Sequence, residues 1–140
     1  MTSSAASAQP TSERWEGSGV VYSIDGKELE TYKVATNVFH PSVNSTRTET
    51  ILQMADGTSK TIAMSILVNG DSFSTQSNLG NGGGACYGEG LCENYIKDEN
   101  GRSYATTIIQ DAAGSRRHLT IIMDNGKAIK VLREKVMRAN

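Results

Sequence analysis

The sequence predicts an all-β protein, an antiparallel up-and-down barrel of eight to ten strands, and three observations support this. At five points between segments of alternating residues, Asn or Asp is followed by Gly, a dipeptide typical of type I′ hairpin turns. Apolar and polar residues alternate between these turns, as in strands with one buried face. The connections are mostly short, which favours a barrel over a sandwich, although alternation alone fits both. The five turns are Asp25-Gly26, Asp56-Gly57, Asn69-Gly70, Asn100-Gly101 and Asn125-Gly126.

The first half of the chain contains five predicted strands. In the first, Gly17 and Gly19 share a face and leave room for a large neighbouring side chain. The second ends before Pro41, because proline cannot donate a backbone hydrogen bond to the next strand. The fourth has the most regular alternation in the sequence, which excludes a helix there. We expect these strands at residues 15–24, 28–40, 47–55, 60–68 and 73–78.

The second half begins with a segment that interrupts the strand pattern. Six of the twelve residues from Leu79 to Gly90 are glycine, and we expect this segment to be a loop with a tight reversal. Strands are predicted again at 91–97, 103–110, 118–123 and 127–136. Residues 131–138 also contain good helix formers, so a final helical turn remains an alternative.

Length and composition indicate one domain. The chain has 140 residues, enough for a single core. Residues 1–12 are mostly Ser, Ala and Thr, and we expect a flexible N-terminal tail there, followed by one barrel domain at 13–140. Part of this tail resembles the region around a signal-peptidase site, which favours an exported, secreted or periplasmic protein.

Charge and hydropathy argue against two classes of partner. The net charge is −1, so no broad electrostatic field attracts nucleic acid or a membrane surface. No apolar run approaches the roughly 20 residues that a transmembrane helix needs. We therefore expect neither a nucleic-acid partner nor a membrane span.

The two cysteines, Cys86 and Cys92, lie in the glycine-rich segment. Five intervening residues, without a further Cys or a nearby His, make a poor metal site, so we expect no bound metal. A disulfide requires the chain to reverse at residues 88–90, because bridged Cα atoms lie within roughly 7 Å of each other. The sequence favours this disulfide, and an oxidising compartment, over two free thiols.

The two ends of the barrel domain resemble the calycin superfamily, which includes lipocalins, fatty-acid-binding proteins and nitrobindin-like barrels. The resemblance rests on the early strand Trp15-Glu-Gly17-Ser-Gly19, the meander that follows it, and Arg133 in the last strand. It implies that Trp15 closes one end of the barrel and packs under Arg133. Glu13 stands where lipocalins have Gly, and the carboxylate clamp of fatty-acid-binding proteins is absent because Glu134 and Lys135 follow Arg133.

A barrel of this size can be filled with side chains or can hold one small ligand. Aromatic residues make up only 6% of the chain, and Thr is mixed with apolar residues on the predicted inner faces, which favours a cavity. We therefore predict an exported, non-catalytic barrel that binds a small hydrophobic or amphipathic ligand. The polar residues predicted to line the cavity are Tyr22, Tyr32, Tyr104 and Arg133.

Two other functions remain open. A filled barrel would act as a protein-interaction module, with Tyr87 in the segment Leu79 to Gly90 as its contact surface. A barrel isomerase or cyclase would use Tyr104 or His118 as proton donor, although no catalytic motif is present. No motif for a cofactor is present either, because the glycine-rich segment lacks the Lys and helix of a phosphate-binding loop.

Overall fold

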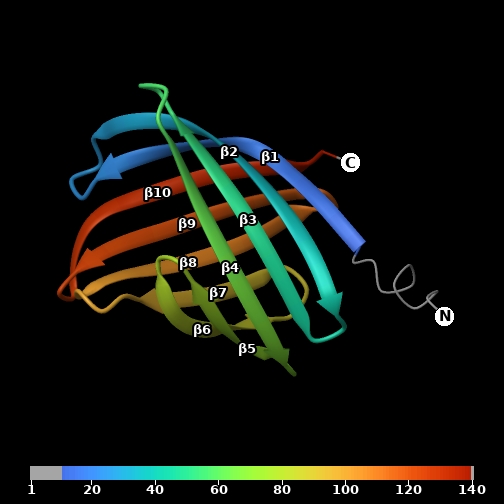
Figure 1. Cartoon of the computed structure of the whole chain (residues 1–140). Coiled ribbons are helices and arrows are strands. Elements are labelled where there is room, and N and C mark those ends of the chain that lie inside the picture. Colours follow the sequence, from blue (N-terminus) through green and yellow to red (C-terminus); the bar gives the residue numbers. More distant parts are fainter. Residues whose placement is uncertain (1–10, 140) are drawn as a thin grey trace.

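The computed structural model describes residues 11–139, and these residues form ten antiparallel strands and no helix (Figure 1). The all-β prediction is confirmed, at the upper end of the expected number of strands. The strands are β1 (Thr11–Ser23), β2 (Glu28–Ser42), β3 (Ser45–Met54), β4 (Ser59–Asn69), β5 (Ser72–Ser77), β6 (Gly80–Tyr87), β7 (Leu91–Lys97), β8 (Arg102–Ala112), β9 (Ser115–Asp124) and β10 (Lys127–Arg138).

The strands form a closed barrel in which each pairs with its neighbours in the sequence and β1 pairs with β10. Figure 1 shows β1 lying between β2 and β10, which completes the circle. The β1–β10 seam runs from Trp15 opposite Arg138 to Ser23 opposite Lys130. Closure leaves the barrel wall without a free sheet edge. The up-and-down topology and the preference for a barrel over a sandwich are both confirmed.

All five predicted turns join successive strands, but only one has the expected conformation. Asn125 and Gly126 both have positive φ, 50° and 81°, as a type I′ turn requires. In the other four dipeptides only the glycine has positive φ. At Gly26, Gly57 and Gly101 the loop is longer than two residues. At the first, the amide of Ser23 donates to the carbonyl of Lys27 at 2.9 Å. Asn69 instead pairs with Ser72 around a two-residue loop whose first residue is Gly70, the position where a type II′ turn has glycine.

The glycine-rich segment is a strand rather than the predicted loop. Residues 80–87 form β6, and turns are confined to Leu79 and the reversal at 88–90. A Cβ on Gly82 or Gly84 would overlap the backbone carbonyl oxygen of Tyr95 or Glu93 on β7. Glycine therefore allows β6 to approach β7 closely, and hydrogen bonds from β5 and β7 offset its low strand propensity.

Three strand boundaries also differ from the predicted ones. Pro41 lies inside β2 at a shift of register between Phe39 and Ser42, where a missing donor is tolerated. Thr11 and Ser12 pair with β2, so the strand begins within the predicted tail, and the rest of that tail lies outside the described residues. β10 continues as a strand to Arg138, so the alternative prediction of a final helical turn is wrong.

The hydrophobic core lies against one wall of the barrel. Its buried residues come from β1, β2, β3 and β10, and Met54, Ile62 and Leu132 pack partly buried against them. The inner wall from β5 to β9 combines apolar side chains, among them the buried Ile96, with polar ones such as Thr75 and Thr106. The core residues are Trp15, Val21, Tyr32, Val34, Val38, Leu52 and Val136.

Candidate functional site: the barrel interior

A hydrogen-bonded cluster from three strands lies inside the barrel. The Tyr32 hydroxyl on β2 donates to Glu134 Oε2 on β10 at 2.6 Å. His118 on β9 donates from Nδ1 to Glu134 Oε1 at 3.1 Å. We call these three residues the Glu134 cluster. Its carboxylate accepts one bond on each oxygen, so both neighbours are held in place.

Gly19 makes the Glu134 cluster possible. Strand register places Gly19 on β1 between Tyr32 and Glu134. A Cβ on Gly19 would overlap the Tyr32 ring, so the ring lies across the glycine and reaches β10. Tyr32 is 4% exposed. Burial, followed by the charge and hydrogen bond of Glu134, raises the pKa of the Tyr32 phenol far above its ordinary value, which keeps it a neutral donor.

The wall opposite the core adds further polar groups to the interior. Thr106 on β8 bonds to Thr120 on β9 at 2.9 Å. Thr75 on β5 donates to the Asn94 side chain on β7 at 3.2 Å. Thr106 and Thr120 remain half-buried although they face inward. Apolar side chains such as Phe73 and Ile96 also face inward from these strands, so the interior has a mixed lining.

Trp15 lies at one end of the barrel, which we call the Trp15 end. Its indole is 4% exposed and donates from Nε1 to Glu13 at 3.1 Å. The guanidinium over the ring belongs to Arg116 of β9, 4.0 Å from the ring centroid, and not to Arg133. The predicted packing of Trp15 under Arg133 is wrong. Side chains alternate along β10, so Arg133 faces outward and is exposed, whereas Val136 faces inward and is buried.

Electrostatics at the Trp15 end favour charged Glu13. Burial alone raises the pKa of Glu13, but the indole hydrogen bond, Arg138 and His40 outweigh burial and lower it below its ordinary value of 4.5. Burial lowers the pKa of Arg116, and the nearby Glu13 partly opposes this effect. The result is an indole held between a carboxylate and a guanidinium.

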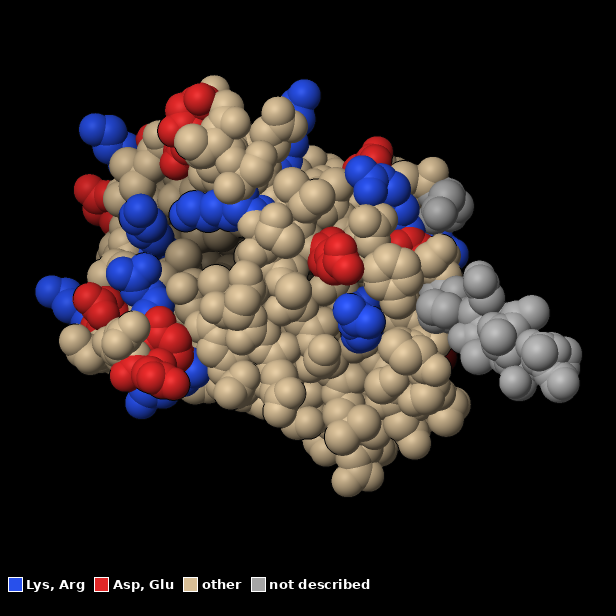
Figure 2. Space-filling view, in the orientation of Figure 1, with Lys and Arg blue, Asp and Glu red and all other residues tan. Residues whose placement is uncertain are grey.

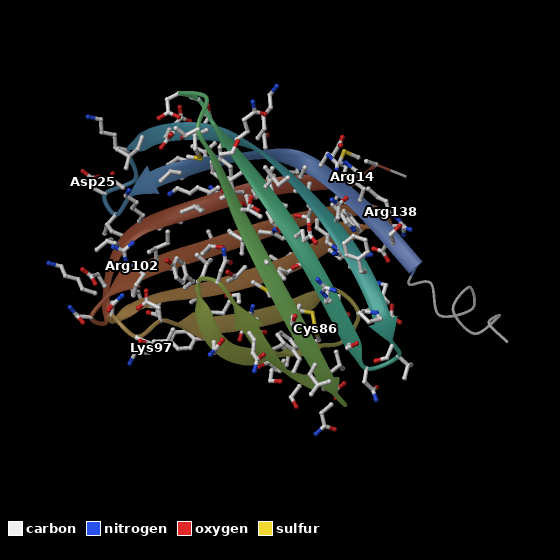
Figure 3. The ribbon with its side chains drawn as sticks, in the orientation of Figure 1. Arg14, Asp25, Cys86, Lys97, Arg102 and Arg138 are labelled. Carbon is white, nitrogen blue, oxygen red and sulfur yellow. A yellow bond between two sulfur atoms is a disulfide. The ribbon has the colours of Figure 1, made fainter. Side chains whose placement is uncertain are left out.

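The opposite end, which we call the Arg102 end, is hollowed. Figure 2 shows a hollow there bordered by Lys and Arg side chains, and Figure 3 labels Asp25, Lys97 and Arg102 at this end. A depression of about 590 Å³ lies between the β5–β6 and β7–β8 turns, with Tyr104 in its lining. Arg102 shares the inner face of β8 with Tyr104. Its buried Nε has no hydrogen-bond partner among the described residues.

The four residues predicted to line a cavity divide into two pairs. Tyr32 and Tyr104 lie on the inner face, whereas Tyr22 and Arg133 alternate with inward residues and lie outside.

Sequence reasoning missed Glu134, Arg102 and Arg116. A signal was present for Glu134, because it stands between Leu132 and Val136 on one face of the last strand. An isolated acid on an apolar face indicates a buried partner.

The predicted disulfide is confirmed. Cys86 and Cys92 are directly opposite each other on β6 and β7, and their sulfurs are bonded. The chain reverses at residues 88–90, with Gly88 at a φ of 70°. The disulfide faces the interior near the Trp15 end, and Cys86 is labelled in Figure 3.

Within residues 11–139, no three His, Cys, Asp or Glu side chains gather as a metal site would require. The same residues include no apolar helix of the length needed to cross a bilayer.

Comparison with known proteins shows a similarity in fold to a solved structure. No family model and no curated protein sequence matches the chain. Among solved structures, the chain is similar to a protein of unknown function from the DUF3598 family of Nostoc punctiforme, with a TM-score of 0.69 and 11% sequence identity. The similarity covers 90% of this chain and 46% of that one, so this chain spans about half the length of its structural neighbour. At this identity the likeness shows the fold alone: a closed antiparallel barrel.

Proposed function

We propose that the protein is an exported, non-catalytic barrel that binds a small amphipathic molecule in its interior, as its resemblance to calycins implies. The observation that carries this proposal is the mixed lining of the interior. The apolar core on β1, β2, β3 and β10 lies across from a wall on which Thr75, Asn94, Thr106 and Thr120 stand among apolar side chains. A mostly apolar lining with a few polar groups is typical of small-molecule sites, and an amphipathic ligand can contact both kinds of group.

The Arg102 end supports entry of the ligand from that side. A depression of about 590 Å³ lies within the range of roughly 300–1,000 Å³ typical of small-molecule sites. The unpartnered Nε of Arg102 is a buried donor, and leaving such a donor unsatisfied costs free energy. We place an acceptor group of the ligand, such as a carboxylate or sulfonate, beside Arg102 and Tyr104.

The disulfide supports export. Cys86 and Cys92 are bonded, and disulfides persist in oxidising compartments such as the periplasm or the extracellular space. The proposed ligand would therefore be captured outside the cytoplasm.

Binding of anilinonaphthalene sulfonate, an apolar dye with one anionic group, tests this function. We expect one saturable site, which Arg102→Met weakens about tenfold, because the dye loses a charge-assisted hydrogen bond. Arg133→Met removes a cation from the outer face and should leave the affinity within about twofold. Unfolding midpoints of both variants check that the barrel is intact. Absence of a saturable site, or equal loss in both variants, would contradict the proposal.

A proton-transfer enzyme is the second candidate, and the Glu134 cluster favours it. Glu134 orients His118 through Nδ1, and His118 Nε2 makes no hydrogen bond to a described residue. This arrangement suits a general acid or base. Incorporation of solvent deuterium into a bound ligand tests it, because a proton-transfer enzyme should catalyse this exchange and His118→Gln should abolish it. Absence of exchange in the unchanged protein would reject the enzyme.

A further inference from the structure

A second groove lies on the outer surface, away from the barrel interior. It measures about 400 Å³ and runs over β6, β7 and β8. Tyr87 and Tyr95 in its lining are 57% and 47% exposed. Each is next in sequence to an inward-facing residue, Cys86 or Ile96, so both tyrosines face outward. Large aromatic side chains that remain this exposed are candidates for ligand contact.

The floor of this groove is low because its side chains are small. Strand register aligns Gly83 on β6 with Tyr95 and Ala105. In the next outward-facing row, Ala85 is aligned with Glu93 and Thr107. Gly83 has no room for a Cβ, which would overlap the carbonyl oxygen of Phe73. The tyrosine rings therefore stand above a flat base that a ring-shaped molecule could lie against.

The spacing of the two tyrosines restricts the ligand. Tyr87 is opposite Leu91, which precedes Tyr95 by four residues along β7. At about 3.3 Å per residue, the two tyrosines are roughly 13 Å apart along the strand. A cage for one organic cation needs aromatic faces within about 6 Å of the charge on each side, so a spacing of roughly 13 Å suits it poorly. The groove instead suits an elongated ligand with a flat apolar face at more than one point.

The charges of the groove favour a neutral ligand rich in hydroxyl groups. Glu93 lies between the tyrosines and forms no ion pair among the described residues. Lys97 follows two residues beyond Tyr95 on the same outer face and lies outside the lining of the groove, so it offsets the charge of Glu93 without contacting the site. The Glu93 carboxylate accepts hydrogen bonds, and the Thr107 hydroxyl both donates and accepts them.

We infer that this groove binds a neutral oligosaccharide, with sugar rings stacked on Tyr87 and Tyr95 and hydroxyl groups donating to Glu93. A sugar ring presents C–H groups on its faces and hydroxyls around its edge. It therefore matches an exposed phenol beside a carboxylate better than a purely apolar or a charged ligand does. The site is separate from the interior, and neither proposal depends on the other.

Calorimetric titration of the full chain with cellohexaose, maltohexaose and hexa-N-acetylchitohexaose tests the inference. We expect saturable binding of at least one of these sugars, and Tyr95→Ala should weaken it about tenfold. Tyr95→Phe keeps the ring and should change the affinity by less than about threefold. Tyr87→Ala should act like Tyr95→Ala, whereas Leu67→Ala, at an exposed position on β4, should have no effect.

Folding is checked by the unfolding midpoint, which these exposed substitutions should leave unchanged. The inference is overturned if none of the three sugars binds, or if Tyr95→Ala binds as tightly as the unchanged protein. Loss of a protein partner in Tyr87→Ala, without any sugar binding, would identify an interaction module and would also overturn it.

Discussion

Strand alternation determines which arginine packs on Trp15. Arg133 lies on β10, a strand of the seam, and Arg116 lies on the neighbouring β9. Only Arg116 is on the inner face of its strand. Val136 is opposite Arg116 and Gly17, and Gly17 shares the inner face of β1 with Trp15. A shift of one residue moves a side chain to the other face, so an approximate position near the chain end cannot identify the partner.

Replacing each arginine by alanine separates the two assignments. Arg116→Ala should lower the free energy of unfolding by about 0.5–2 kcal/mol, the range for a cation over an indole. Because Trp15 is the single tryptophan of the chain, its fluorescence should also change. Arg133→Ala should leave the fluorescence unchanged and the free energy of unfolding within about 0.5 kcal/mol. The opposite result would show that Arg133, and not Arg116, packs on the Trp15 ring.

Glu13 makes the Trp15 end sensitive to pH. The folded protein lowers the pKa of Glu13, so the carboxylate stabilises the fold above its unfolded pKa. This contribution should be lost as the pH falls through the folded pKa. Urea unfolding from about pH 7 to about pH 3 should therefore show a steeper fall in the unchanged protein than in Glu13→Gln. Parallel curves for the two proteins would mean that Glu13 contributes nothing.

At the scale of single elements, β6 depends on its neighbours more than the other strands do. Its inner positions Gly80, Gly82 and Gly84 offer no side chain to the core, and glycine loses more conformational entropy on folding than other residues. Backbone bonds to β5 and β7 and the Cys86–Cys92 disulfide hold the strand in place.

Removing the disulfide should loosen this part of the barrel first. The bond joins residues with a sequence separation of six, and a loop this short implies a loss of about 2 kcal/mol when both cysteines become alanine. Hydrogen exchange should become faster in β6 and β7 and remain slow in β1, β2 and β10, where the core lies. Equally faster exchange throughout the barrel would show that the disulfide supports the whole fold instead.

At the scale of the whole molecule, the β1–β10 seam joins the two ends of the described chain. The other pairings form between neighbours in sequence, whereas this one closes over the whole domain. Gly17 lies in the seam, and a Cβ there would overlap the carbonyl oxygen of Lys135. The absence of a side chain at this position is therefore a condition for closure.

Gly17→Val should open the seam. We expect a loss of about 3 kcal/mol or more in urea unfolding, since the added side chain must separate two strands. Exposed strand edges should also make the variant aggregate, which size-exclusion chromatography detects. Gly90→Ala is the matched control, because its nearest neighbour, Gln110 O, would be 3.4 Å from the new Cβ. Similar stability of both variants would show that the seam tolerates a side chain.

The amino-acid sequence alone was sufficient to predict the disulfide and the hairpins outside the glycine-rich segment. Turn dipeptides such as Asn125-Gly126 and the period of two in β4 are local properties, and they do not depend on distant residues. Cys86 and Cys92 are also close in sequence, so a single reversal at residues 88–90 brings them together.

Only the tertiary structure decided which faces point inward, and therefore which residues form the site. Arg116 meets Trp15, and Tyr32 meets Glu134, because the register between strands that are distant in sequence aligns them. The strand conformation of β6 likewise depends on carbonyl groups of β5 and β7 that surround its glycines. Register across the seam is a property of two paired strands, so the residues of either strand alone do not specify it.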